Sequence, residues 1–196
     1  QFLLFLSAVI KAVDEYQDLL RISVASAGND HRLGANEAPP AIVSMFLGDD
    51  LTEILESIAS GKASKGRKKD NMGLGVHVLP DIPKDTTDRN RTSPLAFTGN
   101  KFEFRMPGSS FSMSGPNVAL NTIVAKALKE FYNALKDAKD FGKAVTELIA
   151  ENYKAHSRIV FNGNAYSPSW VEEAEERGLL NLQSAPDAFD QYIAPK

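Results

Sequence analysis

The chain has 196 residues, of which 43% are hydrophobic and 24% are charged, and its 22 basic and 25 acidic residues give a formal net charge of −3. This composition is typical of a globular protein and argues against disorder. A net charge close to zero argues against binding nucleic acid or an anionic membrane through bulk electrostatic attraction. Because the sequence contains no cysteine, disulfides, thiolate nucleophiles and cysteine-ligated zinc sites are excluded.

The first segment of the chain is amphipathic. Apolar residues recur at helical spacing from Phe2 to Leu20, which predicts a helix. The opening apolar block, 2–6, is far shorter than the roughly 20 residues that cross a bilayer. It also lacks the basic leader of a signal peptide. Since the pattern begins without Met and without a cap, we expect the chain to be a piece of a longer polypeptide.

The next segments predict a strand, a loop and a second strand. Residues 21–26 alternate weakly and contain β-branched side chains, which favours a strand. Residues 28–40 contain several Gly, Asn, Asp and Pro residues, which predicts a loop. Residues 41–47 form an apolar run that predicts a buried strand.

A short helix and a long polar region follow. Asp49 or Asp50 is expected to cap the helix, in which apolar residues recur with helical spacing. The region 60–91 has few apolar residues and opens with the basic run 61–69. A charge block of this kind is typical of a solvated surface loop, and a polar region of this length is usually functional or disordered.

The clearest strand alternates charged and apolar side chains. Lys101, Glu103 and Arg105 are expected on one face of the sheet, and Phe102 and Phe104 on the other. Helices dominate the remainder, so the predicted fold class is α+β. We expect Pro116 in the first turn of a long helix whose apolar face includes Ala127 and Phe131. We also expect a helix capped by Asp140, a short strand at 158–161, and a helix that starts at Ser167-Pro168 and closes at Gly178.

Basic residues around the clearest strand suggest a site for a phosphorylated ligand. Arg89 and Arg91 lie just upstream, and together with Lys101 and Arg105 they could converge on a polyanion. Glu103 would then be available to a divalent cation, the combination that phosphate chemistry needs. Magnesium keeps several water or phosphate ligands, so one glutamate is only part of a site. The alternative is a solvent-exposed sheet face with cross-strand ion pairs.

A second candidate site is the polar segment 29–39. It places amide, carboxylate, imidazole and guanidinium groups together in a loop, and loops on a rigid scaffold commonly carry binding groups. The alternative is an ordinary capped turn.

Three motifs follow one another along the chain: Arg32 ahead of Glu37-Ala38-Pro39, then Arg89-Asn90-Arg91-Thr92, then Lys101-Phe102-Glu103-Phe104-Arg105-Met106-Pro107. This succession resembles the glutamine synthetase family, and specifically its type III branch. The likeness continues through NVALNTIVAKALKEF and IVFNGNAYSPSWVEEAEERGLLNL, so it covers nearly the whole chain. The resemblance implies a partial antiparallel-sheet catalytic domain over 1–115 and a mainly helical continuation over 116–196.

The resemblance also implies a reaction. It is the ATP-dependent ligation of ammonia to the γ-carboxylate of L-glutamate, through a γ-glutamyl phosphate intermediate. By the same resemblance, Arg32 holds the carboxylate of the substrate, and Glu37 closes the site and takes a proton from ammonium. Arg91 corresponds to the arginine that stabilises the transferring phosphoryl group.

The remaining roles concern the strand and the cofactors. Lys101 replaces a more usual arginine and offers charge to the nucleotide phosphates, Glu103 corresponds to a ligand of Mg²⁺ or Mn²⁺, and Arg105 contacts the substrate. The resemblance further implies a cytoplasmic homo-oligomer with a double-ring assembly, and no nucleic-acid or membrane partner.

Some features depart from the family pattern. The segment between Arg32 and Glu37 is one residue shorter, and Ala96 stands where shorter family members carry another arginine, so groups from 61–69 would help to meet the phosphates. Because other metal ligands and the ATP signature belong to upstream strands, we expect the isolated chain to be inactive. The alternatives are a related glutamate–amine ligase and a non-catalytic anion- or RNA-binding module.

Overall fold

The computed structural model describes residues 1–35, 37–61, 71–72, 82–83 and 92–193. Its helices are α1 (Phe2–Glu15), α2 (Gln17–Ile22), α3 (Ala27–Arg32), α4 (Asp49–Ser60), α5 (Ser114–Leu135), α6 (Phe141–His156), the 3₁₀ turn η1 (Ser157–Ile159), α7 (Pro168–Glu176) and α8 (Ala185–Ile193). Its strands are β1 (Met45–Phe46), β2 (Asn71–Met72), β3 (Ile82–Pro83), β4 (Leu95–Phe97) and β5 (Phe102–Phe104). Within these described ranges, no helix has the length and apolar character needed to cross a membrane.

The main sheet is small and mixed. Its strand order is β1-β4-β5, with β1 parallel to β4 and β4 antiparallel to β5. Met45 lies opposite Leu95, and Ala96 lies opposite Glu103. A separate pair, β2 and β3, is antiparallel. The α+β class expected from the sequence is confirmed at this level.

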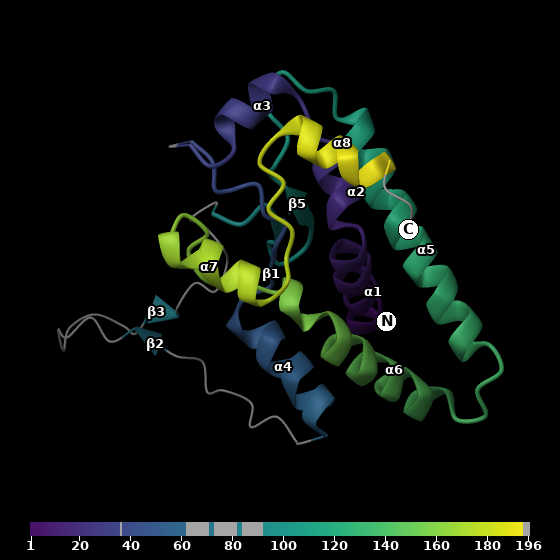
Figure 1. The fold of residues 1–196 in the computed structure, drawn as a ribbon. Helices are drawn as coiled ribbons and strands as arrows, with labels where there is room; N and C mark the ends of the chain where they lie inside the picture. The colour runs from purple at the N-terminus through teal and green to yellow at the C-terminus, as the bar shows by residue number, and fades with distance from the viewer. Residues whose placement is uncertain (36, 62–70, 73–81, 84–91, 194–196) are drawn as a thin grey trace.

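The helices enclose a core built around α1. Helix α1 packs against α5 and α6, and α4 packs against α6 (Figure 1). Leu6 and Ile10 of α1 are fully buried, together with Trp170 of α7. The predicted apolar face of α5 is confirmed, because Ala127 and Phe131 are buried in the same cluster. Residues from both halves of the chain therefore share one core.

The prediction of a strand over 21–26 is wrong, because residues 21–22 end α2 and residues 23–24 form a turn. Leu20 and Val24 are both fully buried. The helix expected from Phe2 to Leu20 is interrupted at Tyr16, whose φ of −122° and ψ of 35° separate α1 from α2.

The loop expected over 28–40 begins with a helical turn, α3. Its cap was overlooked: the Ser26 side chain accepts a hydrogen bond from the Asn29 backbone N–H at 3.2 Å, as N-cap serines do. Residues 41–45 are buried as expected, although only Met45–Phe46 belongs to a strand. The strand expected over 158–161 is instead η1 followed by a single bridge between Val160 and Met45.

Helix ends agree with the sequence at four predicted positions, including the start of α7 at Ser167-Pro168, and disagree at the start of α4. Asp140 caps α6 by accepting from the Lys143 N–H at 3.0 Å. Pro116 lies in the first turn of α5, and Gly178 follows α7 with a φ of +70°. The predicted aspartate cap of α4 is wrong, because Gly48 is the N-cap residue. The two aspartates lie in the first turn instead, where negative charge favours the helix dipole.

Candidate functional site

The charged face of β5 is arranged as its alternation predicts. Glu103 receives hydrogen bonds from Arg105 through Nε at 3.1 Å and Nη2 at 3.0 Å, and its other oxygen lies 3.1 Å from Lys101 Nζ. Phe102 and Phe104 pack against the core on the opposite side. The Lys101 ammonium, followed by the Arg105 guanidinium, lowers the pKa of the Glu103 carboxyl below its ordinary value.

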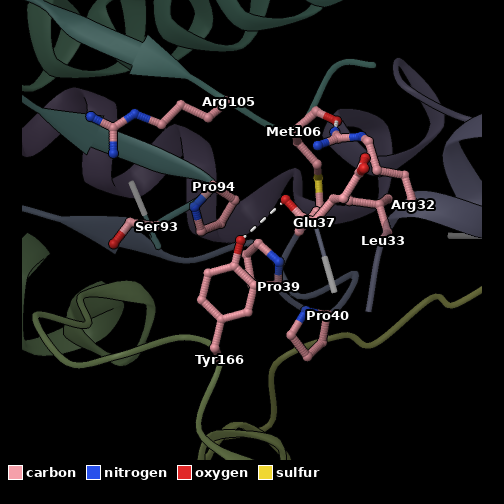
Figure 2. Close-up of a pocket in the computed structure, with 11 residues that line it drawn as sticks. Arg32, Leu33, Glu37, Pro39, Pro40, Ser93, Pro94, Arg105, Met106 and Tyr166 are labelled. Carbon is pink, nitrogen blue, oxygen red and sulfur yellow. Dashed lines mark hydrogen bonds between the residues drawn. The ribbon is translucent and has the colours of Figure 1, made fainter. Parts of the chain in front are cut away.

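An open cleft lies where the end of β5 meets the segment after α3. It is small and open, with about 330 Å³ of empty space that includes solvent at its mouth. Its lining combines two arginines, one glutamate, one tyrosine and one serine with apolar residues (Figure 2): Arg32, Leu33, Glu37, Ala38, Pro39, Pro40, Ser93, Pro94, Arg105, Met106 and Tyr166. Guanidinium groups in such a cleft can bind the carboxylates of a small anionic ligand.

Arg32, the last residue of α3, is anchored by its own helix and by the segment after β5. Its Nε donates to Asn29 Oδ1 at 2.9 Å, and its Nη2 donates to the backbone carbonyl of Met106. Figure 2 shows the guanidinium beside Met106 at one side of the cleft. Helix α3 is itself tied down by Asp30, which lies 2.6 Å from the buried Arg21.

Glu37 is carried by a short closed loop. Gly34 has a φ of +81°, a conformation that favours glycine, and its N–H donates to Pro39 O at 2.9 Å. Tyr166 donates from its hydroxyl to the Glu37 carbonyl at 3.2 Å, the dashed line in Figure 2. The carboxylate of Glu37 has no hydrogen-bond or ion-pair partner within the described part of the chain. An unpaired, exposed carboxylate of this kind can receive a cation.

The structure brings three of the predicted site residues to one cleft: Arg32, Glu37 and Arg105. Glu103 is connected to the cleft through its ion pair with Arg105, and Lys101 lies on the other side of Glu103. Arg89, Arg91 and most of the basic run, 62–69, fall outside the described residues. Their convergence with the strand stays a prediction.

The described residues do not by themselves form a metal site. They contain no group of three or more His, Asp or Glu side chains placed to hold an ion. Glu103 offers one carboxylate, and both of its oxygens already face cationic groups. Mg²⁺ takes about six oxygen ligands in total. Glu103 supplies only one carboxylate, so the other ligands would have to come from elsewhere.

Two residues of the site, Ser93 and Tyr166, were not singled out by the sequence, and Asn29 was included in the segment 29–39 without a role of its own. Ser93 is 1% exposed and its hydroxyl has no hydrogen-bond partner among the described residues, Tyr166 holds the loop of Glu37, and Asn29 holds Arg32. The burial of Ser93 and the bond from Tyr166 to Glu37, 129 residues away, are not revealed by local spacing. The contact between Asn29 and Arg32 spans only three residues, which is the spacing of neighbours on one helix face. For Tyr166 the available signal was that it lies inside a segment with the family resemblance.

Comparison with known proteins identifies the family of the chain. The sequence model described as the glutamine synthetase C-terminal domain matches residues 144–196. The type-3 glutamine synthetase of Dictyostelium discoideum is 50% identical over 199 residues, covering 100% of this chain and 27% of that protein. The glutamine synthetase of Butyrivibrio fibrisolvens is 47% identical, over 98% of this chain and 28% of that protein.

A third relative gives the same result. The glutamine synthetase of Bacteroides fragilis (strain YCH46) is 45% identical over 97% of this chain and 27% of that protein. The chain therefore spans about a quarter of the length of the curated relatives that it matches. Because these alignments cover almost the whole chain at 45–50% identity, the chain belongs to the glutamine synthetase family. It is similar to the type-3 branch of that family.

Proposed function

We propose that this chain supplies part of the active site of a glutamine synthetase, which ligates ammonia to the γ-carboxylate of L-glutamate with consumption of ATP. The observation that carries the proposal is the cleft in which Arg32, Arg105 and Glu37 meet. Two guanidinium groups suit a substrate with two carboxylates. One unpaired carboxylate suits the incoming ammonium ion.

In this proposal each charged residue of the cleft has a different role. Arg32 holds a carboxylate of glutamate, and Arg105 contacts the substrate from the end of β5. Glu37 attracts ammonium and accepts its proton, so that neutral ammonia attacks the γ-glutamyl phosphate and the phosphate group leaves. A positioned carboxylate can act as such a general base. Its place on a loop stiffened by Pro39 and Pro40 keeps the carboxylate at the opening of the cleft.

The phosphate side of the reaction involves Arg91 and Lys101. We assign Arg91 to the transferring phosphoryl group and Lys101 to the phosphates of the nucleotide. Glu103 contributes one carboxylate to a divalent cation, Mg²⁺ or Mn²⁺, whose remaining ligands come from other parts of the longer protein. When bound, such a cation neutralises charge that develops on phosphate oxygens.

The proposal extends to the organisation of the whole protein. We assign residues 1–115 to part of the catalytic domain, with the substrate and phosphate loops, and residues 116–196 to its mainly helical continuation. The longer protein is proposed to act as a homo-oligomer in the cytoplasm. An enzyme of this kind needs glutamate, ammonia and ATP, but no nucleic acid or membrane.

The test uses the full-length protein that contains this chain. It is incubated with ATP, L-glutamate and ammonium, and glutamine and ADP are measured. Replacing ammonium with hydroxylamine should yield γ-glutamyl hydroxamate, because the acyl phosphate reacts with either nucleophile. Turnover with a larger amine and none with ammonium would instead favour a related glutamate–amine ligase. Absence of any glutamate-dependent ADP formation would contradict the proposal.

A further inference from the structure

The side chain of Asn29 is built into the site although it does not line the cleft. It is 3% exposed and makes three hydrogen bonds. Its Nδ2 donates to the carbonyl oxygens of Val24 at 2.8 Å and Met106 at 3.2 Å, and its Oδ1 accepts from Arg32 Nε at 2.9 Å. The partners fix the orientation of the amide, because carbonyls require the NH₂ group and a guanidinium requires the oxygen.

These contacts determine which edge of the Arg32 guanidinium is left for a ligand. The side edge, made of Nε and Nη2, is taken by Asn29 Oδ1 and by the Met106 carbonyl. Nη1 has no hydrogen-bond partner in the described ranges. The end of the guanidinium, where Nη1 and Nη2 each keep an N–H, can therefore receive two carboxylate oxygens at once.

We propose that Asn29 is a positioning residue that aims Arg32 at a carboxylate of the substrate. The inference rests on the proposed function, since it assumes that Arg32 binds glutamate. Asn29 joins the two segments that meet at the cleft, α3 and the residues after β5, through the same Met106 carbonyl that Arg32 uses. Without the amide, one fixed contact of the guanidinium is lost and the arginine can rotate away from its binding orientation.

The first test compares Asn29→Ala with Asn152→Ala in the full-length protein. Asn152 is a matched control because it is 7% exposed and also donates two hydrogen bonds from Nδ2, to the backbone oxygen and hydroxyl of Ser7 at 2.9 Å each, away from the cleft. We expect Asn29→Ala to raise KM for glutamate about 10-fold, the usual effect of losing a hydrogen bond to a charged group. KM for ATP should change little. Asn152→Ala should lower thermal stability and leave KM for glutamate unchanged.

A double-mutant cycle separates this inference from the proposed function. Arg32→Lys keeps the charge but removes the planar fork, so it should raise KM for glutamate, and Asn29→Ala should add little in that background. If Arg32→Lys leaves KM unchanged, the assignment of Arg32 to the substrate fails. If Arg32→Lys raises KM while Asn29→Ala behaves like Asn152→Ala, the role of Asn29 is overturned.

A second variant keeps the test decisive if Asn29→Ala does not fold. A Cβ added at Gly108 would lie 3.3 Å from Asn29 Oδ1, so Gly108→Ala presses on the oxygen that receives Arg32 Nε. Gly28→Ala is the control. Gly28 lies on α3 beside Asn29, and a Cβ added there meets nothing within 4 Å. We expect Gly108→Ala to raise KM for glutamate several-fold relative to Gly28→Ala. Equal KM values in the two variants would contradict the inference.

Discussion

Tyr166 donates a hydrogen bond of 3.2 Å from its hydroxyl to the backbone carbonyl of Glu37, although the two residues are 129 positions apart. The bond connects the segment before α7 to the loop that carries the proposed catalytic carboxylate. Tyr166 also lines the cleft (Figure 2). The position of Glu37 therefore depends on the second half of the chain.

Replacing Tyr166 with Phe removes this bond and keeps the ring. We expect the loop of Glu37 to become less ordered and KM for ammonium to rise about 2–10-fold, the usual range for one neutral hydrogen bond. KM for ATP should stay the same. Tyr132→Phe is the control, since Tyr132 is 65% exposed on α5. Steady-state kinetics of the full-length protein give the answer, and identical ammonium KM values in both variants would argue against the role of Tyr166.

Glu37→Gln keeps the shape of the side chain and removes its charge. If Glu37 accepts the proton of ammonium, acyl phosphate formation should survive while ammonia capture falls by about 10²–10⁴-fold, the range of general-base effects. Hydroxylamine is neutral near pH 7 and a better nucleophile, so the loss with hydroxylamine should be smaller. The two amines are compared in the full-length protein with ATP and glutamate. Equal losses with both would identify Glu37 as a structural loop residue.

The ion pairs of Glu103 should make stability depend on pH. Lys101, followed by Arg105, lowers the pKa of Glu103 in the folded chain, so the unfolded state binds a proton more readily. This contribution is therefore present above the pKa of the unfolded state and is lost as the pH falls through the lower folded pKa. Denaturation of wild type and Glu103→Gln between pH 3 and pH 7 should show their difference shrinking in acid.

Glu147→Gln provides the comparison for that experiment. Glu147 lies 3.7 Å from Lys143 in an exposed pair on α6, and exposed pairs of this spacing contribute little. Its effect should be smaller than that of Glu103→Gln at neutral pH. A difference between wild type and Glu103→Gln that stays constant down to pH 3 would show that the pairs on β5 do not contribute to stability.

Asp14 stabilises the junction of three elements. Its buried carboxylate accepts from His156 Nδ1 at 2.8 Å and Arg158 Nε at 2.7 Å, and so joins α1 to α6 and η1. Asp14→Asn leaves these donors without a charged acceptor, which should cost about 3 kcal/mol. The melting temperature should fall by about 6–12 °C. Asp137→Asn, at an exposed position, is the control, and a similar melting temperature for both variants would contradict the prediction.

The purified 196-residue chain should show no glutamate- and ammonium-dependent ATP hydrolysis. Its described residues offer a single candidate carboxylate for the metal, Glu103, which is too few to hold a cation and a nucleotide in reacting geometry. The measurement is phosphate release from ATP with and without glutamate and ammonium, beside the full-length protein as positive control. Clear turnover by the chain alone would show that the site needs fewer parts than proposed.

Local patterns in the sequence determined the features that depend on neighbouring residues. The alternation around Glu103 predicted its face of β5, and the helical spacing predicted the buried face of α5. Asp140 was correctly expected as a cap. Each of these follows from the period of the backbone or from a hydrogen bond within one turn, so residues close in sequence are sufficient to specify them.

Tertiary structure decided the rest, because it depends on partners that are far away in sequence. Residues 21–26 carry a β-branched pattern, yet the segment starts in a helix, and Arg21 binds the carbonyl of Leu182 at 2.7 Å. The cap of α4 is Gly48, whose N–H donates to Asn162 at 3.0 Å.

The site, too, combines features set by local sequence with features set by tertiary contacts. Motif spacing identified Arg32 and Glu37, but the bonds that orient them come from Met106 and Tyr166, 74 and 129 residues away. Only the packing of α3, β5 and the segment before α7 brings these groups together, since a hydrogen bond is formed within about 3 Å whatever the separation along the chain.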